Sequence, residues 1–239
     1  MATSRHYDAV FEWGIANRGE LARSLNGEGR VDKWMKLLRR NGCVPRTVVD
    51  IGCNDGSLAR AMAASGMGQS FTLIDASKAA VDYVQKHPFA GLDAALTGDA
   101  YDLPLGDRSF DLAVLSHAVE HLAHPTDAID EAARVARQVL VEVPLQDAWL
   151  SNLSAVVEKR RTGLPRSTNA VGHLHFFTDR TFRNTAQRSG KIRIADSIVY
   201  IPAERKGWRR PLSRIGVRAY GHLLQTHGIY LMETAPEPR

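Results

Sequence analysis

The stretch VVDIGCNDGSL, residues 48–58, is the clearest local indication of the fold of this chain. Its first four residues form a mostly apolar run typical of a buried strand, and Gly52 and Gly56 allow the backbone to turn sharply into a helix. The first turn of such a helix presents unpaired N–H groups to a ligand. Strand, glycine loop and helix in this order predict a nucleotide-like ligand at the carboxyl end of a parallel sheet. A purely structural glycine turn is the alternative.

Short apolar runs alternate with helical patterns on both sides of this stretch. The helical patterns have apolar faces, such as Ile129 with Ala132, Ala133 and Ala136. This alternation predicts an α/β fold, with a Rossmann-like doubly wound sheet and helices on both of its faces. We expect strands at 47–51, 71–74, 94–97, 110–115, 139–143, 192–200 and 228–233, and a helix at 179–188 ended by Gly190.

The chain divides into three parts of one expected domain. Residues 1–44 form a helical N-terminal cap, 45–145 the core, and 146–239 the acceptor-side segment and last strands. A helical insertion separates the last two strands. In it, residues 211–224 place apolar side chains on one helical face and arginines on the other. A helix packed on the sheet edge, a dimer contact, an anionic acceptor and a membrane surface all fit that pattern.

The composition is that of an ordinary globular protein, with 44% hydrophobic and 24% charged residues among 239. No apolar run approaches the length of a membrane span, and the first residues lack the apolar stretch of a signal peptide, so we expect a cytoplasmic protein. Cys43 and Cys53 are too few for a disulfide framework. The formal charge of +5 is spread along the chain, so no nucleic-acid partner is expected.

Two acidic residues follow the second and third predicted strands. Asp75, followed by Ala76, stands where a carboxylate can accept both hydroxyls of a ribose. It could instead cap the next helix at Ser77. Asp99 and Ala100 follow the third strand, where a carboxylate and a backbone N–H can face an adenine edge. The glycine loop lacks the G-x-G-x-x-G spacing of dinucleotide enzymes, which disfavours that class.

With these motifs the sequence resembles the class I S-adenosylmethionine-dependent methyltransferases, in particular the small-molecule methyltransferases. The resemblance runs from about residue 47 to 190 through VVDIGCNDGSLA, TLIDAS, TGDAYDLPLGDRSFDLAVLSHAVEHL and GHLHFFTDRTFRNTAQRSG. It implies a seven-stranded sheet with a reversed last strand, and S-adenosylmethionine as cofactor, released as S-adenosylhomocysteine. Asn54 replaces the family's usual middle glycine, and Asn tolerates the left-handed conformation that the loop requires. The residues that the resemblance assigns to the cofactor are Asp50, Gly52, Asn54, Gly56, Asp75, Ala76, Asp99, Ala100, Ser116 and His117.

The acceptor side is harder to predict, because methyl transfer from a sulfonium needs mainly alignment of the two reactants. A general base is required only when the acceptor is protonated at working pH. His117, His173 and His175 are the catalytic candidates, and packing beside Phe176 and Phe177 is the structural alternative for the last two. Tyr7, Phe11 and Trp13 in the N-terminal helices, and the segment 146–172 with Trp149, Lys159, Arg160 and Arg161, are expected to close the acceptor pocket or to form helix core.

The resemblance therefore implies an enzyme that methylates an oxygen or nitrogen of a small-molecule or glycan-like acceptor. An RNA or protein methyltransferase and a non-catalytic cofactor-binding partner are the alternatives. The spacing of carboxylates and histidines indicates no metal site. We expect a monomer or homodimer without a transmembrane segment, and contact with a membrane surface stays open.

Overall fold

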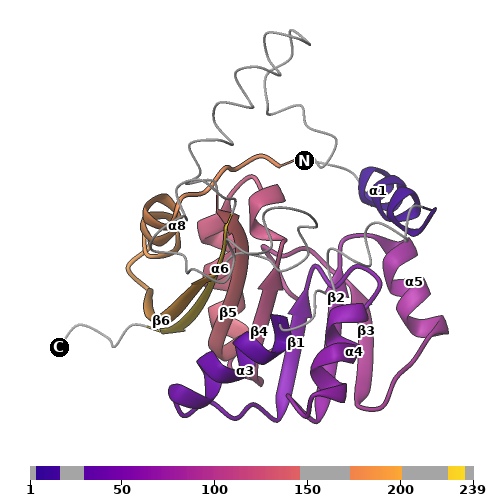
Figure 1. Cartoon of the computed structure of the whole chain (residues 1–239). Coiled ribbons are helices and arrows are strands. Elements are labelled where there is room, and N and C mark those ends of the chain that lie inside the picture. The colour runs from indigo at the N-terminus through magenta and orange to yellow at the C-terminus, as the bar shows by residue number, and fades with distance from the viewer. Residues whose placement is uncertain (1–3, 17–29, 146–172, 201–225, 235–239) are drawn as a thin grey trace, which may run out of the picture.

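A seven-stranded sheet in the order β3-β2-β1-β4-β5-β7-β6 forms the centre of the protein (Figure 1). The computed structural model describes residues 4–16, 30–145, 173–200 and 226–234. Strand β7 is antiparallel to both of its neighbours, and the pairs among β1 to β5 are parallel, which confirms the predicted sheet. The strands are β1 Thr47–Ile51, β2 Ser70–Asp75, β3 Leu92–Thr97, β4 Phe110–Ser116, β5 Ala136–Leu145, β6 Ile192–Tyr200 and β7 Thr226–Thr234.

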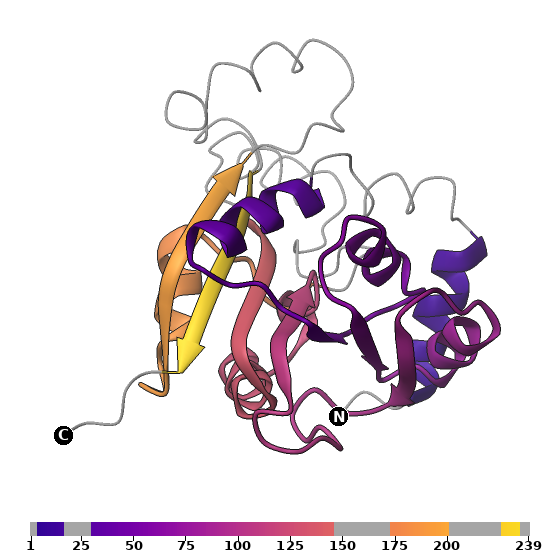
Figure 2. The ribbon, with the colours of Figure 1, turned by 90° about the horizontal axis from the view of Figure 1, so that it is seen from below.

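Helices cover both faces of the sheet (Figure 2). Successive side chains of a strand point to opposite faces, so neighbouring residues enter two different cores. Val48 packs with α3, α4 and α5, whereas Val49 packs on the opposite face with α6 and α8. The helices are α1 Ser4–Ala16, α3 Arg30–Arg40, α4 Ser57–Ala64, α5 Lys78–Lys86, α6 Pro125–Val135 and α8 Asp179–Ala186, with a 3₁₀ turn η1 at Val119–His121.

Two predicted helix boundaries were wrong. Ala136, expected on the helical face of Ile129, is the first residue of β5, because α6 ends at Val135. It is buried all the same, so its apolar character reflects the core and not the helix. The helix expected at 179–188 is α8, which ends at Ala186, and Gly190 adopts a φ of +74° in the turn that follows.

The N-terminal helix α1 lies beside α5, next to the carboxyl end of β2 (Figure 1). Phe11 is nearly buried, and its ring packs on Tyr83 of α5 with centroids 5.9 Å apart. Asp8 accepts hydrogen bonds from Ser77 Oγ at 2.7 Å and from the Ala79 N–H at 3.1 Å. Phe11 is therefore helix core, as one of the two interpretations expected, and α1 is attached to the start of α5.

We expect Asp8→Ala to loosen α1 from the core. The substitution removes an acceptor from the first turn of α5, and the loss of such a cap costs about 1 kcal/mol. Hydrogen exchange of the α1 amides should accelerate. Asp82→Ala, which removes only an exposed ion pair with Lys78 in the same helix, is the control. Equal exchange of the α1 amides in both variants would contradict the attachment.

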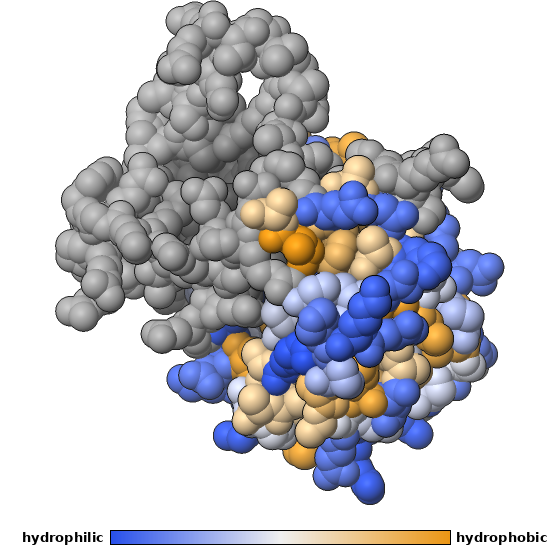
Figure 3. All heavy atoms as spheres, turned by 90° about the vertical axis from the view of Figure 1, so that its right-hand side faces the viewer, coloured by the Kyte–Doolittle hydropathy of each residue, from blue (hydrophilic) through white to orange (hydrophobic). Residues whose placement is uncertain are grey.

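Several sequence expectations fall outside the described residues, namely the segment 146–172 with its aromatic and basic residues, the helix at 211–224, and the Trp13 side chain. Among the helices that the structure does describe, none is long and apolar enough to cross a membrane. Seen from the side of α1 and α5, the described surface mixes hydrophilic and hydrophobic side chains (Figure 3).

Candidate active site

The glycine loop follows β1 and is hydrogen-bonded to the carboxyl end of the neighbouring strand β2. The N–H groups of Gly52 and Cys53 donate to the carbonyl of Ile74, and the Asn54 N–H donates to Asp75 Oδ2 at 2.8 Å. Gly52, Asn54 and Gly56 all have positive φ values between 52° and 78°. Asn54 thus adopts the left-handed conformation expected of the residue in place of a glycine. A side chain at Gly52 would meet the Ala118 side chain at 3.1 Å, so this loop also packs on the turn after β4.

Asp50 presents a buried carboxylate at the end of β1. Its side chain is 2% exposed, and its Oδ2 atom has no hydrogen-bond partner among the described residues. Burial raises the pKa of Asp50 to about 7, and the charge of Asp75 is the second cause of this rise. A buried carboxylate oxygen without a donor is costly, and a cationic or N–H group of a ligand would relieve that cost.

Asp75 and Asp99 lie near the same N-terminal tyrosine. Asp75 Oδ1 accepts from the Ser77 N–H at 2.8 Å, whereas the cap of α5 is the Ser77 side chain, which accepts from the Ala80 N–H. Asp99 is exposed, and its Oδ1 accepts from the Tyr101 N–H at 3.0 Å. Burial raises the pKa of Tyr7, and the charges of Tyr101, Asp99 and Asp75 raise it further. Tyr7 of α1 is therefore within electrostatic range of both carboxylates.

His117 follows β4 in a strained conformation. Its φ of 53° is uncommon for a residue with a β-carbon and costs of order 1 kcal/mol or more. The surrounding structure holds it there: its N–H donates to the Glu142 carbonyl at 2.9 Å, and its Nδ1 lies 3.2 Å from Glu120 Oε1. These contacts fix the backbone and the ring of His117.

A buried polar cluster, which the sequence analysis missed, lies next to His117. Glu142 of β5 is fully buried, and its Oε2 accepts from Arg30 Nη2 at 2.6 Å and Nε at 3.1 Å. Arg30 Nη2 also donates to Ser116 Oγ at 2.6 Å. The Tyr200 hydroxyl donates to Glu142 Oε1, and Nδ1 of His227 lies 3.5 Å from the same oxygen. Ser116, a predicted site residue, is therefore part of this cluster.

The buried cluster contains a cation, Arg30, and an anion, Glu142. Burial alone would raise the pKa of Glu142, but the charge of Arg30 and the hydrogen bond from His227 hold it well below its usual range. One sequence signal could have identified the cluster. Glu142 interrupts an apolar run at a position whose neighbours on the same face, such as Leu140, are buried. A glutamate in that place requires a buried cationic partner.

His173 and His175 lie near the 3₁₀ turn that contains Glu120 and His121. The backbone N–H of His175 donates to the Glu120 carbonyl at 3.0 Å, and its ring stacks on Phe177 with centroids 5.5 Å apart. The ring of His173 meets His121 edge to face at 4.7 Å. The structure thus brings His117 together with Glu142 and His227, and it gives the ring of His175 the aromatic packing that was its structural alternative.

Two groups of side chains have the chemistry of metal ligands, although sequence spacing indicated none. Their donor atoms lie within 4.8 Å of one another: His117, Glu142 and His227 in one group, and Glu120, His121 and His173 in the other. In the first group Arg30 already neutralises Glu142, which disfavours a divalent cation. In the second, Glu120 Oε1 is engaged by His117. We assign a metal to neither.

The core of this chain is similar to known methyltransferases. A family model for a methyltransferase domain matches residues 49–139. The mitochondrial ubiquinone biosynthesis O-methyltransferase of Schizosaccharomyces pombe is 30% identical over 125 residues, which are 48% of this chain and 43% of that protein. The chain spans about half the length of the curated relatives it matches.

Solved structures share this fold. A chain of the Haloferax volcanii complex between the Trm112 methyltransferase activator and a methyltransferase superposes with a TM-score of 0.65 at 16% identity, over 96% of this chain and 99% of that one. A SAM-dependent methyltransferase from Aquifex aeolicus gives a TM-score of 0.54 at 16% identity, over 88% and 96%. The strand order, the glycine loop and the matched domain agree: residues 49–139 are similar to a methyltransferase domain, and the described fold is that of the class I methyltransferases.

Proposed function

We propose that this chain transfers a methyl group from S-adenosylmethionine to an oxygen or nitrogen of a small-molecule or glycan-like acceptor. The observation that carries the proposal is the Asp50 carboxylate, buried at the glycine loop with its Oδ2 atom lacking a partner among the described residues. The methionine part of the cofactor has an ammonium group that suits this oxygen. When bound, the cofactor supplies an activated methyl group on a sulfonium.

The other predicted cofactor residues fit the same ligand. Asp75 at the end of β2 would accept hydrogen bonds from the ribose hydroxyls, since a carboxylate that accepts from backbone N–H groups still has lone pairs for further donors. Asp99 and Ala100 at the end of β3 would face adenine, with Tyr7 of α1 beside them. The positive φ of Gly52 and the closeness of Ala118 explain why the loop has glycine at this position.

The acceptor is proposed from the relatives and the site together. A relative named for ubiquinone biosynthesis and O-methyl transfer favours a hydroxyl oxygen of a small molecule. A methyltransferase of RNA or protein, and a partner protein without catalysis, are the competing functions. The cytoplasmic location, and the choice between monomer and homodimer, stay predictions.

Calorimetric titration with S-adenosylmethionine, S-adenosylhomocysteine and NAD tests the cofactor. We expect binding of the first two and none of NAD, because the loop lacks the spacing that brings a pyrophosphate to the backbone. Binding of neither sulfur compound would refute the methyltransferase proposal. Transfer of labelled methyl to an RNA or protein fraction, without transfer to small molecules, would favour the competing function.

Asp75→Ala is expected to weaken cofactor affinity by roughly 10-fold to 100-fold. The substitution removes hydrogen bonds to a charged group, worth about 1.5–3 kcal/mol together. Because two backbone N–H groups also lose their acceptor, Asp75→Asn serves as the milder variant. Asp93→Ala, an exposed carboxylate of β3, is the control. Unchanged affinity in a folded Asp75→Ala protein would exclude Asp75 from the site.

A further inference from the structure

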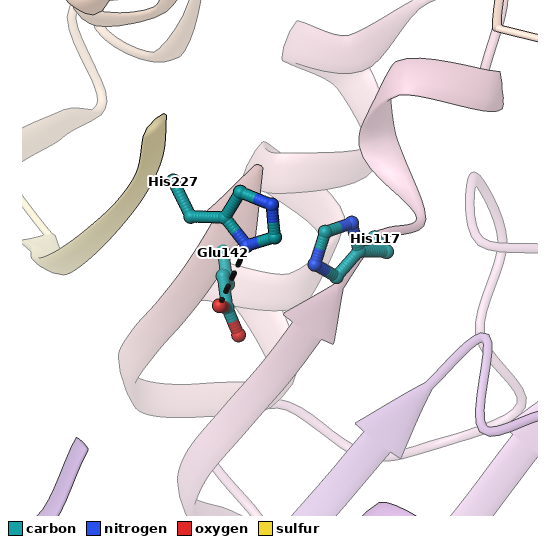
Figure 4. A group of neighbouring side chains, drawn as sticks. All are labelled: His117, Glu142 and His227. Atoms are coloured by element: carbon teal, nitrogen blue, oxygen red, sulfur yellow. Dashed lines mark ion pairs between the residues drawn. The ribbon is translucent and has the colours of Figure 1, made fainter. Parts of the chain in front are cut away.

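Two histidines face each other at the carboxyl ends of β4 and β5, each supported by a different glutamate. His117 Nδ1 lies 3.2 Å from Glu120 Oε1, and His227 Nδ1 lies 3.5 Å from Glu142 Oε1. The two rings meet edge to face with centroids 4.9 Å apart. Figure 4 shows the ring of His227 next to that of His117, with a dashed line for its ion pair with Glu142. The pair therefore consists of two histidines, each with one ring nitrogen directed at a carboxylate.

These contacts determine which ring nitrogen is available. Both glutamates are buried, and a carboxylate only accepts hydrogen bonds, so the Nδ1 atom that faces each of them is favoured as an N–H group. In this tautomer Nε2 carries the lone pair. The side chains of His117 and His227 are 20% and 17% exposed, so each ring retains access to its surroundings. The pair can therefore accept a proton from a molecule beside it.

The groups around His227 keep it neutral. They are Glu142 of β5, Tyr200 of β6, His117 after β4 and Arg30 of α3. Burial lowers the pKa of His227 and outweighs the opposing effect of Glu142, while the charges of His117 and Arg30 lower it further. A neutral imidazole near pH 7 is the form that a general base requires.

The same surroundings favour proton transfer over metal binding. Arg30 occupies Glu142 Oε2 and the Tyr200 hydroxyl occupies Oε1, so the carboxylate has a full set of donors. A divalent cation on Oε1 would also lie close to a guanidinium that is itself buried. Orientation of a histidine by a carboxylate has no such penalty, and it is the common arrangement in histidine general bases.

We propose that His227, paired with His117 and positioned by Glu142, is the general base for methyl transfer to a hydroxyl group. This inference rests on the proposed methyltransferase function. The acceptor oxygen attacks the methyl carbon as the bond from carbon to sulfur breaks, and its electron pair goes to sulfur, giving S-adenosylhomocysteine. The hydroxyl proton goes to Nε2 of His227 and then to solvent. The acceptor class is thus a hydroxyl that is protonated at neutral pH, such as a phenol.

The tautomers can be tested without any acceptor. Nitrogen NMR of the full chain, labelled at histidine and bound to S-adenosylhomocysteine, should show Nδ1–H and bare Nε2 at both His117 and His227. His117→Gln should raise the pKa of His227, because it removes a ring whose own protonation would oppose a charge on His227. An Nε2–H tautomer at His227, or a shift of its signals to a metal-bound position on addition of Zn²⁺, would overturn the proposal.

The base itself can be tested with two phenols of different acidity. Catechol is protonated at pH 7, whereas the nitro group of 4-nitrocatechol makes its hydroxyl ionise near neutral pH. His227→Gln should slow methyl transfer to catechol by about 10²-fold to 10⁴-fold. It should affect 4-nitrocatechol far less, because that acceptor needs no base. His87→Gln, at the far end of α5, is the control.

The outcomes separate this inference from the proposed function. Equal losses with both phenols would make His227 a positioning or structural residue and overturn the proposal. Cofactor binding without transfer to either phenol by the unmodified chain would overturn the assignment to phenolic hydroxyls. Failure to bind S-adenosylmethionine at all would instead refute the methyltransferase function.

Discussion

Glu142→Ala is expected to destabilise the folded chain by about 3–5 kcal/mol, the typical cost of removing one partner of a buried ion pair. The Arg30 guanidinium, whose residue is only 6% exposed, would lose the acceptor of two hydrogen bonds. The Tyr200 hydroxyl would lose its acceptor as well. The loss of stability exceeds the energy of the ion pair alone, since the Arg30 guanidinium stays buried without the Glu142 carboxylate.

Urea unfolding of the variant, followed by far-UV circular dichroism, measures this effect as a lower midpoint. Asp107→Ala is the matched control, because Asp107 pairs with Arg134 at the surface with its side chain 77% exposed, and such pairs contribute about 1 kcal/mol or less. Adding Arg30→Met to Glu142→Ala should restore part of the stability by removing the buried cation that has lost Glu142. A loss below about 1 kcal/mol in the single variant would mean that Arg30 finds another acceptor.

The pH dependence of the Glu142 contribution has a defined direction. Its pKa falls on folding, so the stabilisation is present above the ordinary value of 4.5 and is lost as the pH falls through the lower folded value. The difference in unfolding free energy between the original chain and Glu142→Ala should therefore shrink in acid.

The core of the fold could be predicted because its signals are local. The alternation of apolar runs in 47–143 determines strands that parallel pairing then brings together, and residues 50–56 combine a strand end, positive φ positions and a helix start. Asp75 and Asp99 could be predicted to lie at the same edge of the sheet, because the carboxyl ends of neighbouring parallel strands meet there. Each of these features depends on residues close together in the chain.

The polar cluster could not be predicted because its members are far apart. Arg30 and Glu142 are separated by 112 positions and meet only after α3 packs on the sheet. His227 reaches Glu142 because β7 inserts between β5 and β6, so that residue 227 lies opposite Pro144 and Tyr200. A pattern within one element contains no information about such a strand order. Glu142 alone indicated that a partner was required, without indicating which.

Asp50→Asn is expected to stabilise the free chain at alkaline pH and to weaken its affinity for S-adenosylmethionine. Burial, and then the charge of Asp75, raises the pKa of Asp50 from 3.8 to about 7. A carboxyl group whose pKa rises on folding supports the folded state fully below 3.8, and that support is lost as the pH rises through about 7. At pH 8 the unmodified chain therefore bears the full cost of a buried charge, at most about 4 kcal/mol, which asparagine does not have.

The ligand reverses this preference. The ammonium group of the cofactor would supply the donor that Asp50 Oδ2 lacks among the described residues, and a neutral amide replaces that charge-assisted hydrogen bond poorly. Affinity should fall by roughly 10-fold to 100-fold, from a loss of about 1.5–3 kcal/mol. Thermal unfolding at pH 4 and pH 8, with and without S-adenosylmethionine, measures both effects at once.

Asp55→Asn is the control for this experiment, since Asp55 lies in the same loop and its carboxylate accepts from the Ser57 N–H. Stabilisation of the free Asp50→Asn chain at pH 8 but not at pH 4, with a reduced shift on cofactor addition, would show that Asp50 is kept as a carboxylate for the ligand at the expense of the fold. A destabilised variant with undiminished affinity would mean that Asp50 serves the loop alone, and the ammonium would then need another acceptor.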